Sequence, residues 1–451
     1  MRTPAPVRPP VVLTVAGSDS GGGAGIQADL KTIEAHGAFG TSVVTAVTAQ
    51  NTRGVDSTHL LPLDEIAAQY DAVVGDFDVA AAKTGMLATA DVIDLVADRV
   101  ADLDAPLVVD PVMVAASGDR LLERDAEDAY ADLVAEATVV TPNADEAAVL
   151  TGVEVADADD AVEAGERIVE TGADAALVKG GHVPGDTVVD VLVSAGGVER
   201  FEHPRVDTEA THGSGCTLSS AVAARLAHGD AVADAVEAGT AFMERAVRYH
   251  LDVGRGPGAV HHLVDLRNRA ARDDTAEAVE RIVQEFVDRD VSALVPEVGL
   301  NVVGATPYAE TVAETAAVEG RVTRTLSGVK PNRGVRFGAS SHVARFLLAA
   351  REFDPDLRFA ANCRFGDDVE AALPALDGDV ATFDRGAEPE TVKAAEGSTM
   401  QWAAGQAFGG AGSPVAVVDR GEVGKEAMTR IVARDAETLV ERVLALLDAV
   451  E

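Results

Sequence analysis

The chain has 451 residues, of which 47% are hydrophobic, so it is long and apolar enough for two or three folded domains. Its net charge of −38 argues against nucleic acid and anionic membranes as partners, because both attract basic surfaces. Two cysteines, Cys216 and Cys363, exclude a disulfide framework and a CxxC zinc site, and we expect a reduced cytoplasmic location. No apolar run reaches about 18 residues, so no membrane span is expected.

The acidic residues are spread along the whole chain, and lysine is rare. In molar salt the Debye length is only about 3 Å, which screens repulsion between carboxylates. This composition predicts a protein from a salt-loving microbe, and the alternative is an ordinary acidic enzyme.

Residues 11–264 alternate between short apolar runs and helical patterns. Buried strands are expected at 11–17, 41–47, 105–110, 137–142 and 175–181. Helices are expected at 25–37, 90–100, 143–152 and 157–172, and after Gly213 and Asp230. This alternation predicts a doubly wound, mostly parallel α/β sheet.

The pattern changes near residue 270. We expect a tail at 1–10, a first domain at 11–264, a charged connector at 265–275 and a second, smaller α/β domain at 276–451. The sequence contains no P-loop. GAGIQA matches the glycine pattern of dinucleotide-binding folds, but the acidic residue that such folds have about 20 positions later is missing.

THGSGC, Thr211–Cys216, is a stronger signal. Gly213, Ser214 and Gly215 place backbone N–H groups at a helix start, where the helix dipole favours anionic oxygens such as a phosphoryl group. The same dipole is expected to lower the pKa of Cys216 and make its thiol a proton acceptor. A small buried cysteine that only fills space is the other interpretation.

Three further segments place polar side chains at strand ends. In TPNADE, Asn143 and Glu146 offer oxygens that suit Mg²⁺, although a helix cap with an acidic first turn gives the same pattern. DPVM places Asp110, and VKGGH places Lys179, at the carboxyl ends of strands, where open α/β sheets bind ligands.

Taken together, AGSDSGGGAGIQADLKT, AVTAQNTRGV, KTGML, DPVM, TPNADEA, VKGGH, THGSGCTLSSA and GPGAVHH resemble the hydroxymethylpyrimidine/phosphomethylpyrimidine kinases of thiamine biosynthesis, in the ribokinase superfamily. The resemblance implies ATP, Mg²⁺ and two successive phosphorylations of one pyrimidine. It also implies an anion hole at Gly213–Gly215 and Cys216 as catalytic base, where most ribokinases have Asp. We expect Asp29, Gln50 and Gly17 to bind the pyrimidine, Lys179, Asn143 and His182 to bind ATP, and Glu146 and Asp110 to hold the metal.

The segment from Val318 to Pro355 is basic for so acidic a chain, and GASSHVAR predicts a helix start that favours anions. A solvated basic helix is the plainer interpretation. GRVTR, FGASSHVAR and VVDRGEVGKEA resemble the thiamine-phosphate synthase domain fused to such kinases in archaea. That resemblance implies that the pyrimidine pyrophosphate is joined to thiazole phosphate. We expect Arg321 and His342 to bind the pyrophosphate, with Lys330 and Arg336 as further candidates.

The sequence therefore predicts a bifunctional enzyme with small-molecule substrates and neither nucleic acid nor membrane as partner; a homo-oligomer is compatible with it. Two alternatives stay open. One is a pyridoxal-type kinase of the same fold. The other is the same kinase with a C-terminal domain that senses thiamine phosphate without chemistry.

Overall fold

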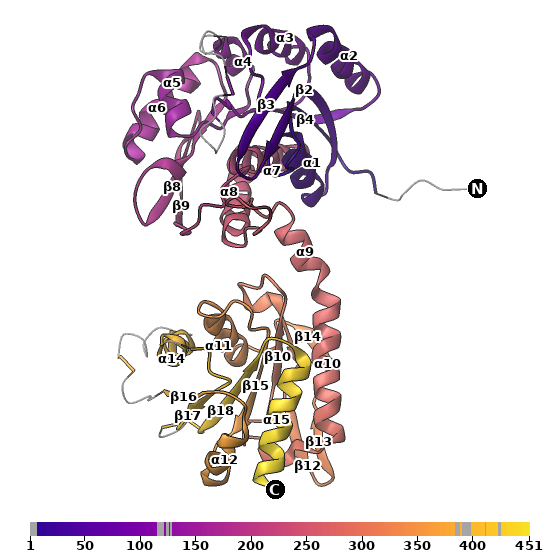
Figure 1. Ribbon diagram of the computed structural model, residues 1–451, viewed down its shortest axis with the longest axis vertical. Coiled ribbons are helices and arrows are strands. Elements are labelled where there is room, and N and C mark those ends of the chain that lie inside the picture. The colour runs from indigo at the N-terminus through magenta and orange to yellow at the C-terminus, as the bar shows by residue number, and fades with distance from the viewer. Residues whose placement is uncertain are drawn as a thin grey trace, which may run out of the picture. The chain divides into compact units, whose positions relative to one another are not determined.

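The computed structural model describes residues 7–114, 121–122, 126, 129–383, 388–389, 398–410, 412–422 and 425–451. The chain divides into two compact units, Met1–Asp265 and Leu266–Glu451 (Figure 1). Helix α9 (Val264–Ala270) crosses this division, so the segment predicted as a connector is largely helical. Residues 1–6 of the predicted tail lie outside the described residues.

The first unit is built on a mixed sheet that, within the described residues, has nine strands in the order β3-β2-β1-β4-β5-β6-β7-β8-β9. The strands from β2 to β7 run parallel, and β3, β8 and β9 add antiparallel edges. Their bounds are β1 Val11–Asp19, β2 Phe39–Asn51, β3 Gly54–Leu60, β4 Val79–Thr84, β5 Leu107–Val109, β6 Val139–Val140, β7 Ala175–Val178, β8 Thr187–Ser194 and β9 Gly197–Pro204.

Helices cover both faces of this sheet, which confirms the predicted doubly wound architecture. Successive side chains of β1 show why: Val12 packs in one apolar cluster with α7 and α8, and Leu13 packs in the other with α2 and α3. The helices are α1 Gly25–Ala35, α2 Leu63–Val74, α3 Ala90–Val100, α4 Tyr130–Ala135, α5 Ala144–Thr151, α6 Ala158–Thr171, η2 Gly180–His182, α7 Ser214–Ala227 and α8 Val232–Arg248.

The second unit is also α/β, but its sheet is mainly antiparallel. Its described part contains a seven-stranded sheet in the order β14-β11-β10-β15-β18-β17-β16, in which only β16 and β17 pair in parallel, and a separate β12–β13 hairpin. The strands are β10 Val302–Ala305, β11 Thr315–Val318, β12 Val322–Thr325, β13 Gly328–Pro331, β14 Val335–Phe337, β15 Phe359–Arg364, β16 Val380–Phe383, β17 Ala416–Asp419 and β18 Met428–Ala433.

Both faces of this second sheet are covered as well. On β10, Val302 packs in the cluster with α10 and α15, and the next residue, Val303, packs with α11 and α14. The helices are α10 Arg272–Asp288, η3 Val291–Leu294, η4 Val312–Glu314, α11 His342–Arg351, α12 Asp367–Ala372, η5 Leu373–Ala375, α14 Ser398–Phe408 and α15 Ala436–Val450. No helix in the described ranges is long and apolar enough to cross a membrane.

Candidate active site

A cavity of about 550 Å³ lies at the carboxyl ends of the parallel strands of the first unit. Asp19 ends β1, Asp110 follows β5, Asn143 follows β6 and Lys179 follows β7, and all four line the cavity. The chain leaves β1 toward β2 on one side, while β4 pairs with β1 on the other. The cavity therefore occupies the topological switch point at which open α/β sheets bind ligands.

The predicted anion loop forms one wall of this cavity. Gly213 is the N-cap of α7 with φ of +83°, and a Cβ there would lie 1.9 Å from the carbonyl oxygen of Gly23, so only glycine fits. The N–H of Ser214 already donates to the carbonyl of Thr211 at 3.1 Å. Gly215 and Cys216 follow in the first helical turn, where N–H groups have no partner within the helix.

The loop faces a buried charged cluster. A Cβ on Gly215 would lie 3.3 Å from Asp110 Oδ2 and 3.4 Å from Lys179 Nζ, so the absence of a side chain leaves both groups open to the loop. Lys179 Nζ lies 3.2 Å from Asp110 Oδ1 and 3.9 Å from Glu146 Oε2. Asp110 Oδ2 is buried and has no hydrogen-bond partner within the described residues. An acceptor-only oxygen in that position suits a cation.

Electrostatics in this cluster follow from burial and the charges. Burial raises the pKa of Glu146 to about 7, although Lys179 counteracts the shift. Burial alone would lower the pKa of Lys179, but Asp110 and Glu146 raise it above its ordinary value. The lysine is therefore a cation at neutral pH.

The two remaining residues predicted to bind ATP also line the cavity. Asn143 caps α5 through a capping box, in which its side chain accepts from the Glu146 N–H and its own N–H donates to the Glu146 carboxylate. His182 lies in η2, and its Nδ1 is 3.3 Å from Asp145 Oδ2. The cap interpretation of the NxxE pattern is thus correct for Asn143, and it holds the Glu146 carboxylate beside Lys179.

The structure corrects one expectation for Cys216. Its half-buried thiol receives a hydrogen bond from the N–H of Gly25, at the start of α1. Burial raises the pKa of the thiol to about 12, with Lys83 opposing the shift and Asp29 and Asp110 adding to it. Burial thus outweighs Lys83 and the Gly25 N–H, and the pKa of the thiol is raised, not lowered as expected.

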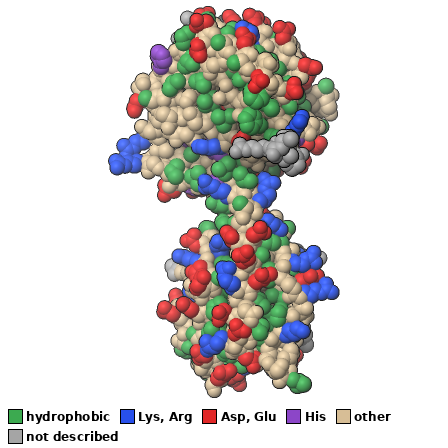
Figure 2. Space-filling model, turned by 90° about the vertical axis from the view of Figure 1, so that its right-hand side faces the viewer, with side chains coloured by type: hydrophobic (Ala, Val, Ile, Leu, Met, Phe, Trp, Pro, Cys, Tyr) green, Lys and Arg blue, Asp and Glu red, His purple; other side chains and the backbone are tan. Residues whose placement is uncertain are grey.

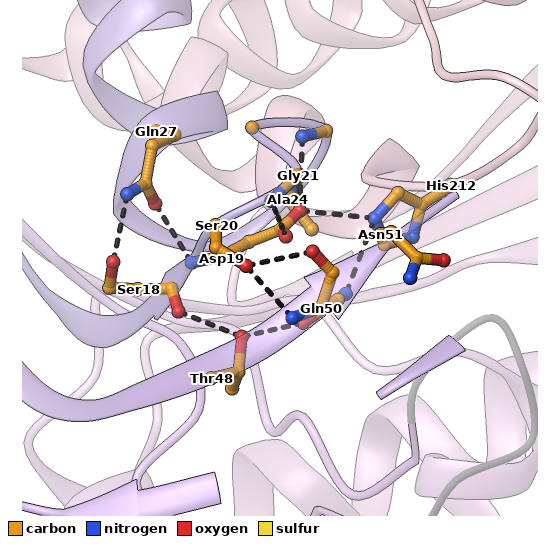
Figure 3. Close-up of polar contacts among 12 residues, drawn as sticks. Ser18, Asp19, Ser20, Gly21, Ala24, Gln27, Thr48, Gln50, Asn51 and His212 are labelled. Carbon is orange, nitrogen blue, oxygen red and sulfur yellow. Dashed lines mark hydrogen bonds and ion pairs between the residues drawn. The ribbon is translucent and has the colours of Figure 1, made fainter. Parts of the chain in front are cut away.

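At the other end of the cavity, Gln50 belongs to a polar network with Thr48, His212 and Asp19, three residues that the sequence did not single out. His212 Nε2 is 3.4 Å from one terminal atom of the Gln50 amide and 3.2 Å from Asp19 Oδ2, and Thr48 Oγ1 is 3.0 Å from the other terminal atom of the amide (Figure 3). Asp19 also accepts from the N–H groups of Gly21, Gly23 and Ala24. Burial would raise the pKa of Asp19, but the hydrogen bonds from His212 and from the N–H groups of Ala24 and Gly21 lower it.

Asp19 and His212 both lie within motifs that the sequence did reveal. Asp19 belongs to AGSD, which ends the first strand together with the predicted Gly17, and His212 directly precedes Gly213. The missing information was that residues 19 and 212 meet in space, since nothing in either local pattern indicates a pairing over that separation.

Asp29 does not line the cavity, which contradicts its predicted contact with the pyrimidine. Its carboxylate is fully buried and accepts from Thr14 Oγ1 at 2.6 Å, Ser220 Oγ at 2.9 Å and Lys83 Nζ at 2.8 Å. The prediction that a carboxylate on this face needs a partner was right, but the partners are protein groups. Asp29 is therefore held in a buried network of protein groups.

In the second unit, the structure separates Arg321 from His342. Gly338 N donates to Thr315 O at the start of β11, and His342 opens α11 just beyond Gly338. Arg321 follows the other end of β11, where its carbonyl accepts from Asn332 N. The two residues therefore follow opposite ends of the four-residue strand β11 along the fold.

The two weaker candidates are surface residues. Lys330 is exposed on β13, and Arg336 is exposed on β14, where its Nη1 lies 3.2 Å from Glu319 Oε2. The stretch VVDRGEVGKEA, which supported the resemblance, is described only in part, because Val423 and Gly424 lie outside the described residues.

The fold and the cavity define a ribokinase-like small-molecule kinase, joined to a second α/β unit. The crystal structure of an ADP complex of Bacillus subtilis pyridoxal kinase is similar to the first unit, with a TM-score of 0.54 and 35% sequence identity. The match covers 57% of this chain and 99% of that one.

Family comparisons identify the chain more closely. It belongs to the phosphomethylpyrimidine kinase family, which matches residues 19–261, and residues 278–445 match the family of thiamine-phosphate synthase ThiN. The chain thus combines a kinase and a thiamine-phosphate synthase domain of thiamine biosynthesis.

Two curated relatives support this assignment. The hydroxymethylpyrimidine/phosphomethylpyrimidine kinase of Streptomyces coelicolor is 51% identical over 258 residues, which are 57% of this chain and 96% of the relative. The thiamine biosynthesis bifunctional protein ThiED of Geobacter sulfurreducens is 45% identical over 263 residues, which are 57% of this chain and 54% of that protein. These matches favour the pyrimidine kinase over the pyridoxal-type alternative.

Proposed function

We propose that residues 11–264 transfer a phosphoryl group from ATP to the hydroxymethyl group of hydroxymethylpyrimidine, and then a second one to the monophosphate. One observation carries this proposal: a single cavity has Gln50 at one end, Lys179 and Asp110 at the other, and the Gly213–Cys216 loop between them. An amide suits the edge of a pyrimidine, a partly exposed lysine cation suits phosphate oxygens, and the loop lies where the phosphoryl group would pass.

In this proposal the loop and Cys216 have distinct roles. The N–H groups at the start of α7 stabilise the charge on the transferred phosphoryl group, with the helix dipole behind them. Cys216, as thiolate, accepts the hydroxymethyl proton while the new O–P bond forms and the bond to the ADP leaving group breaks. Gly17 leaves room beside Met86 at the pyrimidine end, since a Cβ there would lie 3.1 Å from Met86 Sδ.

ATP and Mg²⁺ are proposed at the other end. Lys179, Asn143 and His182 are proposed to contact the nucleotide. Asp110 and Glu146 would hold Mg²⁺ together with phosphate oxygens, and the unpartnered Asp110 Oδ2 supports this assignment. No group of three or more potential metal-binding side chains occurs in the described ranges, which fits an ion that protein sites bind through one or two carboxylates and phosphates. When bound, the ion neutralises phosphate charge.

A competition between two alcohols tests the kinase proposal. With Mg-ATP, the chain is expected to phosphorylate hydroxymethylpyrimidine with a higher kcat/KM than pyridoxal, and to convert the monophosphate onward to the pyrophosphate. A higher kcat/KM for pyridoxal, with no second phosphorylation of the pyrimidine, would support the pyridoxal-type alternative instead.

We propose that residues 276–451 join the pyrimidine pyrophosphate to thiazole phosphate and release pyrophosphate. Because Arg321 and His342 follow opposite ends of β11, comparing the two single variants shows which end of the strand binds the pyrophosphate group of the substrate. Arg321→Ala and His342→Ala should both leave the two phosphorylations intact. The variant at the pyrophosphate end should stop thiamine phosphate formation and let the pyrimidine pyrophosphate accumulate, while the other keeps its activity. Normal synthesis in both variants would remove both residues from the site.

We also propose that the protein works in the cytoplasm. Both Cys216 and Cys363 are free thiols, which agrees with a reduced cytoplasm. We propose an archaeal-type protein from a salt-rich cytoplasm, on the basis of a net charge of −38 and the scarcity of lysine.

A further inference from the structure

The two terminal atoms of the Gln50 amide lie between Thr48 on one side and His212 on the other (Figure 3). Oxygen and nitrogen of an amide have nearly the same shape, so the chemistry of the neighbours decides which atom is which. Thr48 at one end of the amide, and His212 with Asp19 at the other, each show independently which terminal atom of Gln50 is oxygen and which is nitrogen.

The first answer comes from Thr48, which is buried. Its Oγ1 lies 3.0 Å from the carbonyl oxygen of Ser18 and 3.0 Å from one terminal atom of the Gln50 amide. A hydroxyl has one hydrogen, and a carbonyl oxygen can only accept. Thr48 therefore donates to Ser18 and must accept from Gln50, so the Gln50 atom beside it is the NH₂ group.

The second answer comes from His212. Its Nε2 lies 3.2 Å from Asp19 Oδ2, a carboxylate oxygen that also accepts from the N–H groups of Gly23 and Ala24. A carboxylate only accepts, so His212 Nε2 carries a hydrogen. A second N–H group at 3.4 Å would face it with like polarity, whereas an amide oxygen there would accept. Both ends thus require the amide oxygen of Gln50 to lie beside His212 and its NH₂ group to lie beside Thr48.

We propose that Asp19, His212 and Thr48 are positioning residues that hold the Gln50 carbonyl toward His212 and its NH₂ toward Thr48, and thereby fix how the aminopyrimidine ring enters the cavity. The inference rests on the proposed kinase function. After these contacts, Gln50 keeps one acceptor site and one N–H side by side, which match the amino group and the adjacent ring nitrogen of the substrate.

The direction of the amide then decides the direction of the ring. The amino group of the substrate must lie on the His212 side and the ring nitrogen on the Thr48 side. In hydroxymethylpyrimidine the hydroxymethyl group is attached next to the amino-bearing carbon, on the side away from that ring nitrogen. It therefore extends beyond His212, and the next residue is Gly213, where the anion loop begins. An amide turned the other way would point the reacting alcohol away from the loop.

A substrate analogue with a 4-oxo group in place of the 4-amino group tests this proposal. The amino substrate offers a donor at the amino group and an acceptor at the ring nitrogen, whereas the analogue offers a carbonyl acceptor and a ring N–H donor at the same two positions. The full chain is assayed for kcat/KM with both pyrimidines, as wild type, Thr48→Val, Thr48→Ser and His212→Phe. The wild type should prefer the amino compound by at least about 100-fold, because the mismatched ring leaves polar groups unpaired. Thr48→Val and His212→Phe free the amide, and the preference should fall at least tenfold.

Thr48→Ser retains the hydroxyl and should retain the preference, which separates the hydrogen bond from a loss of packing. Because valine has nearly the same shape as threonine, Thr48→Val is expected to fold. It therefore still tests the proposal if the His212→Phe variant does not fold. An unchanged preference in Thr48→Val would overturn the proposal, as would a wild type that accepts both rings equally, and the kinase function would still stand in either case. A wild type that phosphorylates neither ring would overturn the kinase function itself.

Discussion

Cys216 combines a position suited to proton transfer with a thiol that is a poor base at neutral pH. It follows the anion loop directly, but burial raises its pKa to about 12. At pH values far below the pKa of a thiol, the fraction present as thiolate rises tenfold with each pH unit. Catalysis through this thiolate must therefore depend on pH well above neutrality.

We predict that kcat/KM for hydroxymethylpyrimidine rises by about tenfold per pH unit between pH 7 and pH 9, because more Cys216 becomes thiolate. Cys216→Ala should lower turnover by about 10²–10⁴ while ATP binding is kept. Cys216→Asp, whose ordinary pKa is about 3.9, should remove the slope. Initial rates across this range measure both effects. An aspartate variant that keeps the full slope, or near-normal turnover in the alanine variant, would reduce the thiol to a packing residue.

Most of the residues that the sequence predicted for the kinase site line the cavity. The residue that was assigned wrongly has a physical explanation. Gly213, Asp110 and Lys179 were predictable because loops and strand ends of an α/β sheet converge on one edge. Asp29 was misassigned because the sequence shows that it lies on a buried face but not which cation reaches it. Lys83, 54 positions away, pairs with it only once β4 lies beside β1.

The Lys83–Asp29 ion pair joins four elements of the first unit. Lys83 is on β4 and Asp29 on α1, and the same carboxylate accepts from Thr14 on β1 and Ser220 on α7. Both members of the pair are fully buried. Ser220 lies one turn after Cys216 on α7, so the pair also anchors the helix that carries the anion loop.

We predict that Lys83→Met destabilises the first unit by about 3–5 kcal/mol, because it leaves the Asp29 charge buried without its cation. Replacing both residues, as Lys83→Met with Asp29→Leu, should recover most of that loss. Urea unfolding followed by circular dichroism measures the effect. The single tryptophan, Trp402, lies in the second unit and serves as an internal control, since its fluorescence midpoint should not move. A Lys83→Met variant as stable as wild type would contradict a structural role for the pair.

At the scale of the whole molecule, the sequence predicted the parallel core but not the edges of the sheets. Strands such as β1 are continuous apolar runs, whereas β3 and β9 are mostly exposed and carry little hydrophobic signal. The basic segment of the second unit shows a related limit. Arg321 and His342 are 21 positions apart in the sequence, and they follow opposite ends of the strand β11.

Charge acts on the molecule as a whole. Asp and Glu side chains are distributed over the visible face of both units (Figure 2), and the net charge is −38. We predict that the melting temperature falls when KCl drops from molar concentration to about 0.1 M, because carboxylate repulsion is then less screened. Sucrose added at 0.1 M KCl to match the osmolarity should not restore the loss fully. A melting temperature that is constant over this range would contradict adaptation to salt.

The central claim is that one chain makes the pyrimidine pyrophosphate and consumes it. The most direct measurement incubates the full protein with hydroxymethylpyrimidine, thiazole phosphate and Mg-ATP, and follows products by chromatography. We predict that thiamine phosphate forms, that Cys216→Ala stops its formation, and that added pyrimidine pyrophosphate restores it in that variant. Accumulation of the pyrimidine pyrophosphate without thiamine phosphate, in a wild-type protein that binds thiamine phosphate tightly, would contradict the claim and identify the C-terminal unit as a ligand sensor.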